Sequence, residues 1–169
     1  KVPIIAVTGT NGKTTTAHLI HTLLEAGGLR APKVGNIGEP FIAALSEKNP
    51  SDFMVVEVSS FQLEWIETFR PFAAVVTNIS PDHLDRHQDL AEYISWKKRI
   101  FAFQKSEDFL VLNEDDKVVR SFAGAAQAKV RTFSRKIKPT NGTCLEDGNL
   151  VLRTNGASVP ILPSNDFAL

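Results

Sequence analysis

The residues most able to do chemistry lie in a short polar loop near the start of the chain, at positions 9–15. Two glycines in this loop permit a tight turn that exposes successive backbone N–H groups, and the helical pattern that follows adds the positive end of a helix dipole. Lys13 supplies a positive charge for phosphate oxygens, and the Thr14 hydroxyl stands where phosphate-binding loops place a magnesium ligand. The pattern predicts that a nucleotide binds through Gly9, Thr10, Asn11, Gly12, Lys13, Thr14 and Thr15.

The glycine spacing departs from the standard phosphate-loop pattern, which has a glycine five residues before Gly12, where this chain has Val7. An ordinary strand-to-helix turn with a solvated lysine is therefore the alternative interpretation. The context favours nucleotide binding, because an apolar run that begins at Ile4 precedes the loop and an amphipathic helix pattern follows it.

Glu57 is a second candidate, because it interrupts the otherwise apolar strand pattern of residues 53–58. An unpaired carboxylate in a buried strand would cost several kcal/mol, so Glu57 needs a partner. Ligands of open α/β sheets bind beyond the carboxyl ends of the strands, which favours a metal ion held between Glu57 and the phosphate loop. A structural hydrogen bond to a neighbouring loop is the alternative.

Two further groups carry a weaker signal. Residues 78–87 include two histidines, two aspartates and an arginine, which makes His83 a candidate metal ligand, with a surface residue as the alternative. Lys97 and Lys98 lie beside Trp96 in a helical pattern, and periodicity alone predicts that both belong to a solvated basic face.

The elements that must position these residues alternate between helix and strand patterns. Helices are predicted at residues 13–25, 41–47, 89–103 and 117–128, and strands at residues 53–58, 73–79, 109–113 and 130–133, besides the first strand and a short one within residues 32–40. This alternation predicts an α/β fold, with a phosphate-loop-type, mostly parallel sheet and helices on both faces.

The pattern changes in the last part of the chain. Residues 143–146 and 150–153 flank a hairpin turn, and residues 159–162 could add a third strand. We therefore predict a nucleotide-binding core at residues 1–136 and a small antiparallel appendage at residues 137–169 that packs on the main sheet.

The composition narrows the function classes. The chain has 169 residues, of which 43% are hydrophobic, which is enough for one domain with a substantial core. Lysine plus arginine equals aspartate plus glutamate at 19 each, so no nucleic-acid partner is expected. The single cysteine, Cys144, excludes an intramolecular disulfide. No apolar run approaches the roughly 20 residues of a membrane span and no signal-peptide pattern is present, which predicts a cytoplasmic protein with no membrane partner.

Several motifs in the same order resemble the central domain of the Mur ligases. They are residues 9–16, 35–38 and 57–64, Asn78 with residues 82–87, and Tyr93 followed by Lys97. The resemblance covers about residues 3–116, and the chain after Lys136 has none of these motifs. Within the family, the Ser-Ser-Phe-Gln-Leu-Glu run of residues 59–64 is similar to that of the members that add D-glutamate.

The resemblance implies an ATP-dependent acid–amino-acid ligase of peptidoglycan synthesis, acting as a monomer. ATP phosphorylates the carboxylate of UDP-N-acetylmuramoyl-L-alanine, and the amino group of D-glutamate then displaces phosphate. Two Mg²⁺ ions are implied, with Thr14 at one of them, and with Glu57, His83 and a carbamylated Lys97 at the other. The resemblance assigns catalytic roles to Lys13, His83 and Lys97, metal-binding roles to Thr14, Glu57, His83 and Lys97, and positions near the muramoyl substrate to Asn36 and Ser59.

The chain departs from the family in two respects. It ends at Leu169 before the Gly-x-His-Asn-x-x-Asn motif that holds adenine, and it has neither the N-terminal domain that binds uridine diphosphate nor the C-terminal ligase domain. We therefore expect an excised central domain that is inactive alone. The alternatives are another Mur ligase, a folylpolyglutamate synthase, which typically has Gly-Lys-Gly where this chain has Gly-Lys-Thr, and a non-catalytic nucleotide-binding module, although the sequence has no Asn-Lys-x-Asp motif.

Overall fold

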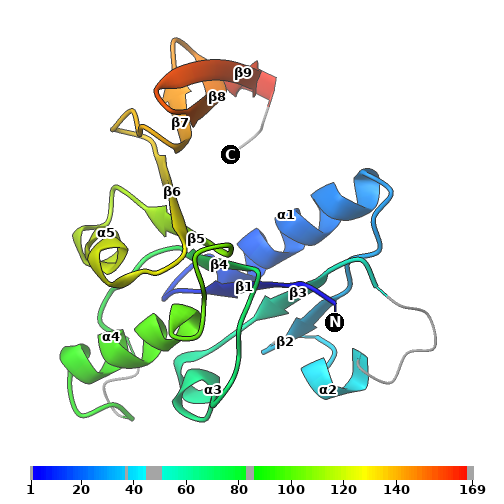
Figure 1. The fold of residues 1–169 in the computed structure, drawn as a ribbon, viewed down its shortest axis with the longest axis vertical. Helices are drawn as coiled ribbons and strands as arrows, with labels where there is room; N and C mark the ends of the chain where they lie inside the picture. Colours follow the sequence, from blue (N-terminus) through cyan, green and yellow to red (C-terminus); the bar gives the residue numbers. More distant parts are fainter. Residues whose placement is uncertain (1, 37, 45–50, 83–85, 167–169) are drawn as a thin grey trace.

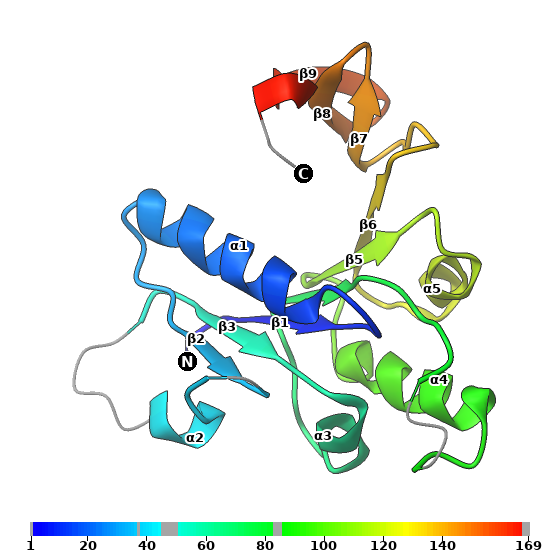
Figure 2. The ribbon, with the colours of Figure 1, turned by 180° about the vertical axis from the view of Figure 1, so that it is seen from behind.

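The computed structural model describes residues 2–36, 38–44, 51–82 and 86–166. In these ranges the strands form a nine-stranded sheet in the order β2-β3-β1-β4-β5-β6-β7-β8-β9, with helices on both faces (Figures 1 and 2). The strands are β1 (Ile4–Thr8), β2 (Lys33–Gly35), β3 (Met54–Glu57), β4 (Ala73–Val76), β5 (Phe109–Asn113), β6 (Lys129–Ser134), β7 (Gly142–Glu146), β8 (Asn149–Thr154) and β9 (Ala157–Pro163). The helices are α1 (Lys13–Ala26), α2 (Phe41–Ala44), α3 (Ser60–Glu64), α4 (Leu90–Lys98) and α5 (Lys117–Ser121). The predicted α/β fold with a mostly parallel sheet is confirmed.

Strand pairing is parallel from β2 through β7. The first strand, β1, lies between β3 and β4, and Val7 of β1 is level with Glu57 on one side and with Val75 on the other. Parallel strands that are in step end at a common edge of the sheet. The loop after β1, the Glu57 carboxylate and the residues that follow β4 therefore meet at this carboxyl edge.

Side chains of the central strands alternate between two cores, one on each face of the sheet. In β1, Ala6 contributes to the core that contains residues of α2, α3, α4 and α5, whereas Val7 contributes to the core beneath α1. Strand β3 continues the alternation, with Val56 in the first core and Val55 in the second. Burial on both faces explains why these strands are continuous apolar runs in the sequence.

The predicted helices differ from the observed ones mainly at their C-terminal ends. The helix predicted at 89–103 is α4 followed by a 3₁₀ turn, η1 (Arg99–Phe101), and the helix predicted at 117–128 is α5 followed by η2 (Phe122–Ala125). Helix α2 covers the start of the prediction at 41–47, whose remaining residues lie outside the described ranges. None of the described helices is both long and apolar enough to cross a membrane.

Helix α3 was not predicted from the sequence, although a local signal for it exists. Ser59 precedes the helix as its N-cap, and the backbone N–H of Gln62 donates to the Ser59 hydroxyl at 3.3 Å. The Gln62 side chain in turn accepts from the Ser59 N–H at 2.9 Å, which completes a capping box. With five residues, the helix is too short for its apolar periodicity to be recognised.

The last three strands extend the sheet edge to edge, which corrects the prediction that they pack on it. Strand β7 pairs in parallel with β6, from Thr132 opposite Gly142 to Ser134 opposite Cys144, and β8 and β9 follow antiparallel. Gly142 permits this pairing, because a Cβ atom there would lie 1.8 Å from the Thr132 carbonyl oxygen. The unpaired N–H and C=O groups of β6 thus find partners in β7. The division of the chain into a core and an appendage at residue 136 stays a prediction.

Candidate active site at the carboxyl edge of the sheet

The loop between β1 and α1 has the backbone conformation that its two glycines were predicted to permit. Gly9 has φ 142° and Gly12 has φ 80°, both in the region that favours glycine. A Cβ atom on Gly9 would lie 2.0 Å from the Thr77 hydroxyl oxygen, so any side chain there would push the loop away from the end of β4. The loop is therefore shaped by close contact with the neighbouring strand.

Helix α1 begins at this loop without a side-chain cap. Its first N–H groups have no acceptor within the helix, and they belong to Gly12, Lys13, Thr14 and Thr15. These donors and the helix dipole together form a site for an anion. The Lys13 ammonium lies over the loop, where its Nζ donates to the Thr10 carbonyl oxygen at 2.8 Å. It can exchange this neutral acceptor for a phosphate oxygen, which is the stronger partner for a charged donor.

The Thr10 and Asn11 N–H groups are already used inside the protein. They donate to the carbonyl and side-chain oxygens of Asn78, each at 2.9 Å. Thr10 is buried, and its hydroxyl lies 3.1 Å from the Tyr93 hydroxyl and accepts from the Ser80 N–H at 3.0 Å. In this conformation Thr10 and Asn11 shape the loop, and the N–H groups that an anion could use are those at the start of α1.

Glu57 is buried, and both of its carboxylate oxygens have partners. Oε2 accepts from the Thr14 hydroxyl at 2.8 Å, and Oε1 accepts from the Asn36 side-chain amide at 3.0 Å. The residue is only 2% exposed, so these two bonds offset the cost of desolvating the carboxylate. The structure thus brings together three residues that the sequence singled out separately. A carboxylate beside a hydroxyl provides the oxygen ligands that Mg²⁺ prefers.

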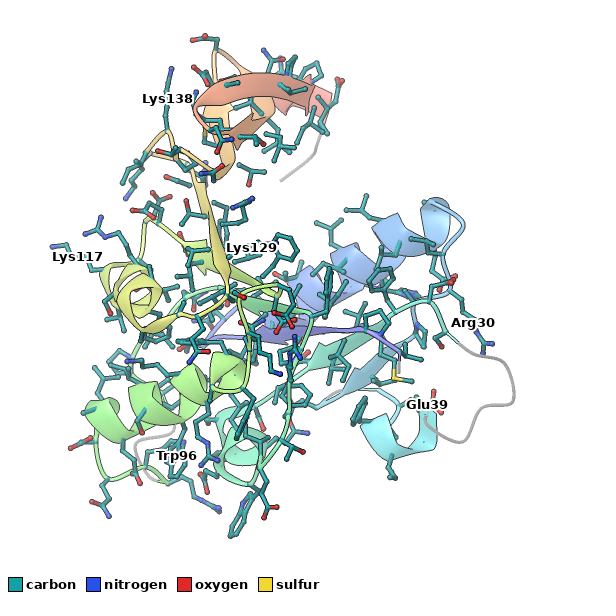
Figure 3. The ribbon with its side chains drawn as sticks, viewed as in Figure 1. Arg30, Glu39, Trp96, Lys117, Lys129 and Lys138 are labelled. Atoms are coloured by element: carbon teal, nitrogen blue, oxygen red, sulfur yellow. The ribbon has the colours of Figure 1, made fainter. Side chains whose placement is uncertain are left out.

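Lys97 is buried, which overturns the prediction of a solvated basic face at this position. The residue is 2% exposed, and its Nζ donates to the Thr8 hydroxyl at 3.2 Å and to the Gly9 carbonyl oxygen at 3.0 Å. It lies one turn after Tyr93 on the face of α4 that packs against the sheet, and its Nζ is 5.2 Å from the Tyr93 ring centroid. By contrast Lys98 is partly exposed, and Lys117, Lys129 and Lys138 are exposed, with Lys117 and Lys138 at the edge of the molecule in Figure 3.

Burial and, to a smaller extent, the nearby positive charge of Lys13 lower the pKa of Lys97 to about 7, against the opposing effects of Asp82 and Glu57. About half of the Lys97 amine is therefore neutral near pH 7, whereas an ordinary lysine is fully charged. A neutral amine is a nucleophile, so this side chain can react where a solvated lysine cannot.

Comparison with known proteins gives the family. A family model described as the Mur ligase middle domain matches residues 7–166. The chain belongs to the Mur ligase family.

Individual relatives are similar over most of this Mur ligase domain. A UDP-N-acetylmuramoylalanine--D-glutamate ligase of Thermoanaerobacter pseudethanolicus is 44% identical over 162 residues, which are 96% of this chain and 36% of that protein. The protein of the same name from Geobacter metallireducens is 46% identical over 155 residues, or 92% of this chain and 34% of that protein. A solved structure of UDP-N-acetylmuramoyl-L-alanyl-D-glutamate--2,6-diaminopimelate ligase has a TM-score of 0.73 at 27% identity, covering 95% of this chain and 39% of that one. The chain thus spans about a third of the length of the curated relatives it matches.

Two further predicted site residues of the Mur ligase domain stay predictions. Ser59 lies at the start of α3, and its hydroxyl also donates to the Gln62 side chain at 3.0 Å, so it caps the helix in this conformation. His83 lies outside the described residues. Within residues 2–36, 38–44, 51–82 and 86–166, no group of three or more His, Cys, Asp or Glu side chains is arranged to hold a metal ion.

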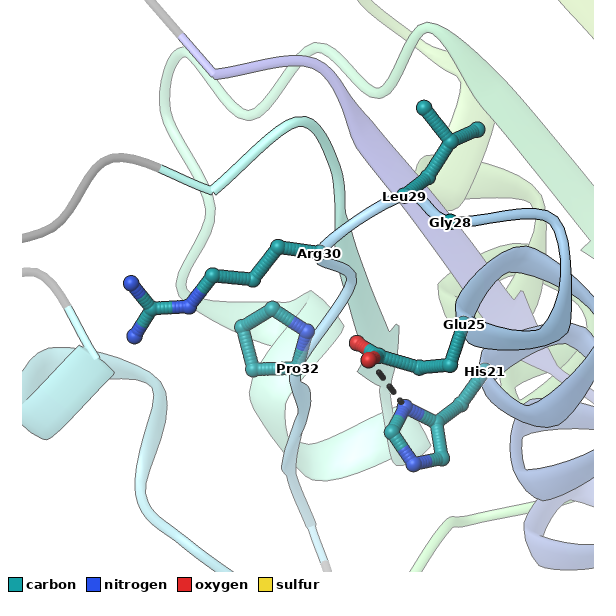
Figure 4. Close-up of a pocket in the computed structure, with 6 residues that line it drawn as sticks. All are labelled: His21, Glu25, Gly28, Leu29, Arg30 and Pro32. Carbon is teal, nitrogen blue, oxygen red and sulfur yellow. Dashed lines mark ion pairs between the residues drawn. The ribbon is translucent and has the colours of Figure 1, made fainter.

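A pocket lies at the opposite end of α1 from the loop. Its lining residues are His21, Glu25, Gly28, Leu29, Arg30 and Pro32, with the His21 ring and the Glu25 carboxylate 4.0 Å apart (Figure 4). Its first lining residue, His21, lies eight residues after Lys13 in α1, which is about 12 Å along the helix at a rise of about 1.5 Å per residue. None of the predicted site residues lines this pocket.

Proposed function

We propose that this chain is the ATP-binding middle domain of a ligase that adds D-glutamate to UDP-N-acetylmuramoyl-L-alanine. The observation that carries the proposal is the meeting of three features at one edge of the sheet: the uncapped start of α1, the buried Glu57 bonded to Thr14, and the buried Lys97. Relatives that are 44–46% identical bear the name of this ligase, which supports the choice within the family.

The phosphates of ATP would lie on the N–H groups at the start of α1. Phosphoryl transfer to a carboxylate brings several negative charges together, so the site must supply positive charge. Lys13 does so by leaving the Thr10 carbonyl and turning to the outer phosphates. Mg²⁺ supplies further positive charge when it is bound.

The residues present suit a magnesium ion. Thr14 and Glu57 place a hydroxyl and a carboxylate 2.8 Å apart beside the proposed phosphate site, so each can exchange the other for a cation. We propose that Thr14 belongs to one metal site, and that Glu57, His83 and a modified Lys97 belong to a second.

Lys97 is proposed to act as a carbamate. The ammonium first loses one proton to solvent, and the neutral amine then attacks carbon dioxide. An N–C bond forms as one C=O π bond opens, and a second proton leaves the nitrogen to solvent, so that a cation becomes an anion. The pKa of about 7 supports this reaction, because a substantial share of the amine is neutral at physiological pH. The anion would then be a metal ligand, and this explains the position of a lysine so close to Glu57.

The proposed substrates are those that the relatives are named for. The carboxylate of UDP-N-acetylmuramoyl-L-alanine takes the terminal phosphate of ATP, and the amino group of D-glutamate displaces phosphate to give the amide. Asn36, which follows β2, and Ser59, the N-cap of α3, are proposed to face the muramoyl substrate. We propose that these reactions take place in the cytoplasm.

The test uses the full-length parent protein and measures phosphate release from ATP. We expect release to require both UDP-N-acetylmuramoyl-L-alanine and D-glutamate, with an amide product in equal amount. Release that instead requires a longer muramoyl peptide or a folate would assign the parent to another ligase of this type. The 169-residue chain alone should make no amide, because it spans about a third of the length of these relatives, and substrate alignment by a whole ligase can be worth about 7–11 kcal/mol.

A further inference from the structure

Asn78, which follows β4, bonds to the phosphate loop through both polar atoms of its side chain. Its Oδ1 accepts from the Asn11 N–H at 2.9 Å, and its Nδ2 donates to the Asn11 carbonyl oxygen at 2.9 Å. The Asn78 backbone adds a third bond, because its carbonyl oxygen accepts from the Thr10 N–H at 2.9 Å. The side-chain amide thus pairs with the Asn11 backbone as a neighbouring strand would.

Thr77 makes a second contact with the same peptide unit. Its hydroxyl donates to the Asn11 carbonyl oxygen at 2.7 Å, so both lone pairs of this oxygen are used. The same hydroxyl oxygen occupies the space that a Gly9 side chain would need. The end of β4 therefore fixes the loop through contact and through hydrogen bonds.

The residues after β4 are themselves held from the next strand. Asn113, at the end of β5, donates to the Thr77 carbonyl oxygen at 2.8 Å. Asp116, the N-cap of α5, accepts from the Ile79 N–H at 2.8 Å while its other oxygen caps the helix. Asn78 thus projects from a backbone that is fixed on both sides, which gives its side chain a defined position.

We propose that Asn78 is a positioning residue that holds the phosphate loop in the conformation that accepts ATP. Asn11 immediately precedes Gly12, the N-cap of α1, so the position of the Asn11 peptide determines where the free N–H groups of α1 point. Asn78 bonds to the Thr10 and Asn11 backbone, which precedes the N–H groups at the start of α1. The inference rests on the proposed binding of ATP at this loop.

The position of Asn78 means that its loss should weaken nucleotide binding more than it lowers the stability of the fold. It is partly exposed at the carboxyl edge and contributes to neither hydrophobic core. Removing it leaves the core intact but releases the Asn11 peptide, so the loop must be ordered again each time a nucleotide binds. That cost falls on binding affinity and not on the chemical step.

The experiment measures the dissociation constant for MgATP, the KM for ATP and kcat in the full-length parent. We compare wild type with Asn78→Ala and with Asn78→Asp, which has the same shape but cannot donate to the Asn11 carbonyl. The control is Asn149→Ala, an asparagine in β8 whose side chain bonds only within its own turn. We expect both Asn78 variants to raise the dissociation constant and KM about tenfold, with kcat within threefold of wild type and the melting temperature nearly unchanged.

Each other outcome has a definite meaning. Asn78 variants that bind MgATP as tightly as wild type, or that lose kcat at unchanged KM, would overturn the inference while leaving the proposed function intact. Failure of the wild-type parent to bind MgATP would instead refute the proposed function. An Asn78→Asp variant that behaves as wild type would show that the donated bond to Asn11 has no role, and this also overturns the inference.

A measurement on the unmodified protein covers the case in which the variants do not fold. Amide hydrogen exchange by NMR compares Asn11, whose N–H is bonded to Asn78, with Gly12, whose N–H lies at the uncapped start of α1. We expect the Asn11 amide to exchange at least tenfold more slowly than that of Gly12 after correction for intrinsic rates. Equal or faster exchange at Asn11 would overturn the inference.

Discussion

Strands β3 and β9 belong to the same sheet but differ in burial, in pairing direction and in position within the sheet. All four residues of β3 are buried, and the strand is parallel to both neighbours and covered on both faces. None of the seven residues of β9 is buried, and the strand pairs antiparallel at the sheet's edge. The candidate site lies at the end of β3 and its neighbours. Buried parallel strands end together, so they bring ionisable side chains into one desolvated place, where charge and pKa values change most.

The sharpest test of this contrast compares two adjacent lysines of α4. We expect Lys97→Ala to reduce kcat of the full-length parent at least a hundredfold, because it removes the buried amine that is proposed to become a metal ligand. A short-chain carboxylic acid should restore part of the activity by filling the vacated position. The Lys98→Ala variant should keep a kcat close to that of wild type, since Lys98 is partly exposed and its Nζ lies 5.6 Å from the centroid of the Phe122 ring. Equal losses in the two variants would contradict the account.

The pH dependence of carbamylation tests the environment of Lys97 directly. Burial and the Lys13 charge lower the pKa of Lys97 to about 7, so the reactive neutral amine is abundant above pH 7 and becomes scarce as the pH falls below it. With ¹³C-labelled carbon dioxide, the NMR signal of the carbamate should be strong at pH 8. It should be much weaker at pH 6, where the neutral fraction of the amine is about tenfold lower, and it should be absent from Lys97→Ala. A signal that appears only near pH 10 would mean that the amine is solvated.

Substitution of Glu57 tests the metal-binding side of the site. In Glu57→Ala the loop and its backbone donors remain, so ATP binding should change less than magnesium dependence does. We expect a magnesium titration of activity to shift at least tenfold to higher concentration. An unchanged titration curve would remove Glu57 from the proposed metal site.

The smallest expected effect is a difference in folding stability between substitutions in β3 and in β9. Val56 is 4% exposed in β3, and Val56→Ala should lower the free energy of unfolding by about 2 kcal/mol through lost burial and a residual cavity. Val159 is 59% exposed in β9, so Val159→Ala should change it by less than about 0.5 kcal/mol. Denaturant unfolding of the isolated chain measures both. Similar losses would mean that β9 is covered in solution.

Much of the fold and part of the site could be predicted from the sequence, for local reasons. The apolar runs of β3 and β4 and the loop before α1 are recognisable because strand burial and glycine-dependent turns leave short-range patterns. The need of Glu57 for a partner was equally evident, since a charge within a buried strand is costly. The partners themselves, Thr14 and Asn36, follow only from the parallel register of β1, β2 and β3.

What could not be predicted depends on tertiary contacts. Helical periodicity placed Lys97 on a solvated face, because it cannot tell that the face shared with Tyr93 packs against the phosphate loop. The parallel pairing of β7 with β6 was also missed, since it depends on a close approach at Gly142. The contact between Asn78 and Asn11 joins residues 67 positions apart and has no local pattern.

The central claim is that ATP binds at the carboxyl edge of the sheet, on the start of α1. A crystal structure of the full-length parent with Mg²⁺ and a non-hydrolysable ATP analogue tests it most directly. The account predicts phosphate oxygens within hydrogen-bond distance of the Gly12 and Thr14 N–H groups, with Lys13 moved from the Thr10 carbonyl to the nucleotide. A nucleotide bound elsewhere, such as in the pocket beside His21 at the other end of α1, with Lys13 still on Thr10, would contradict it.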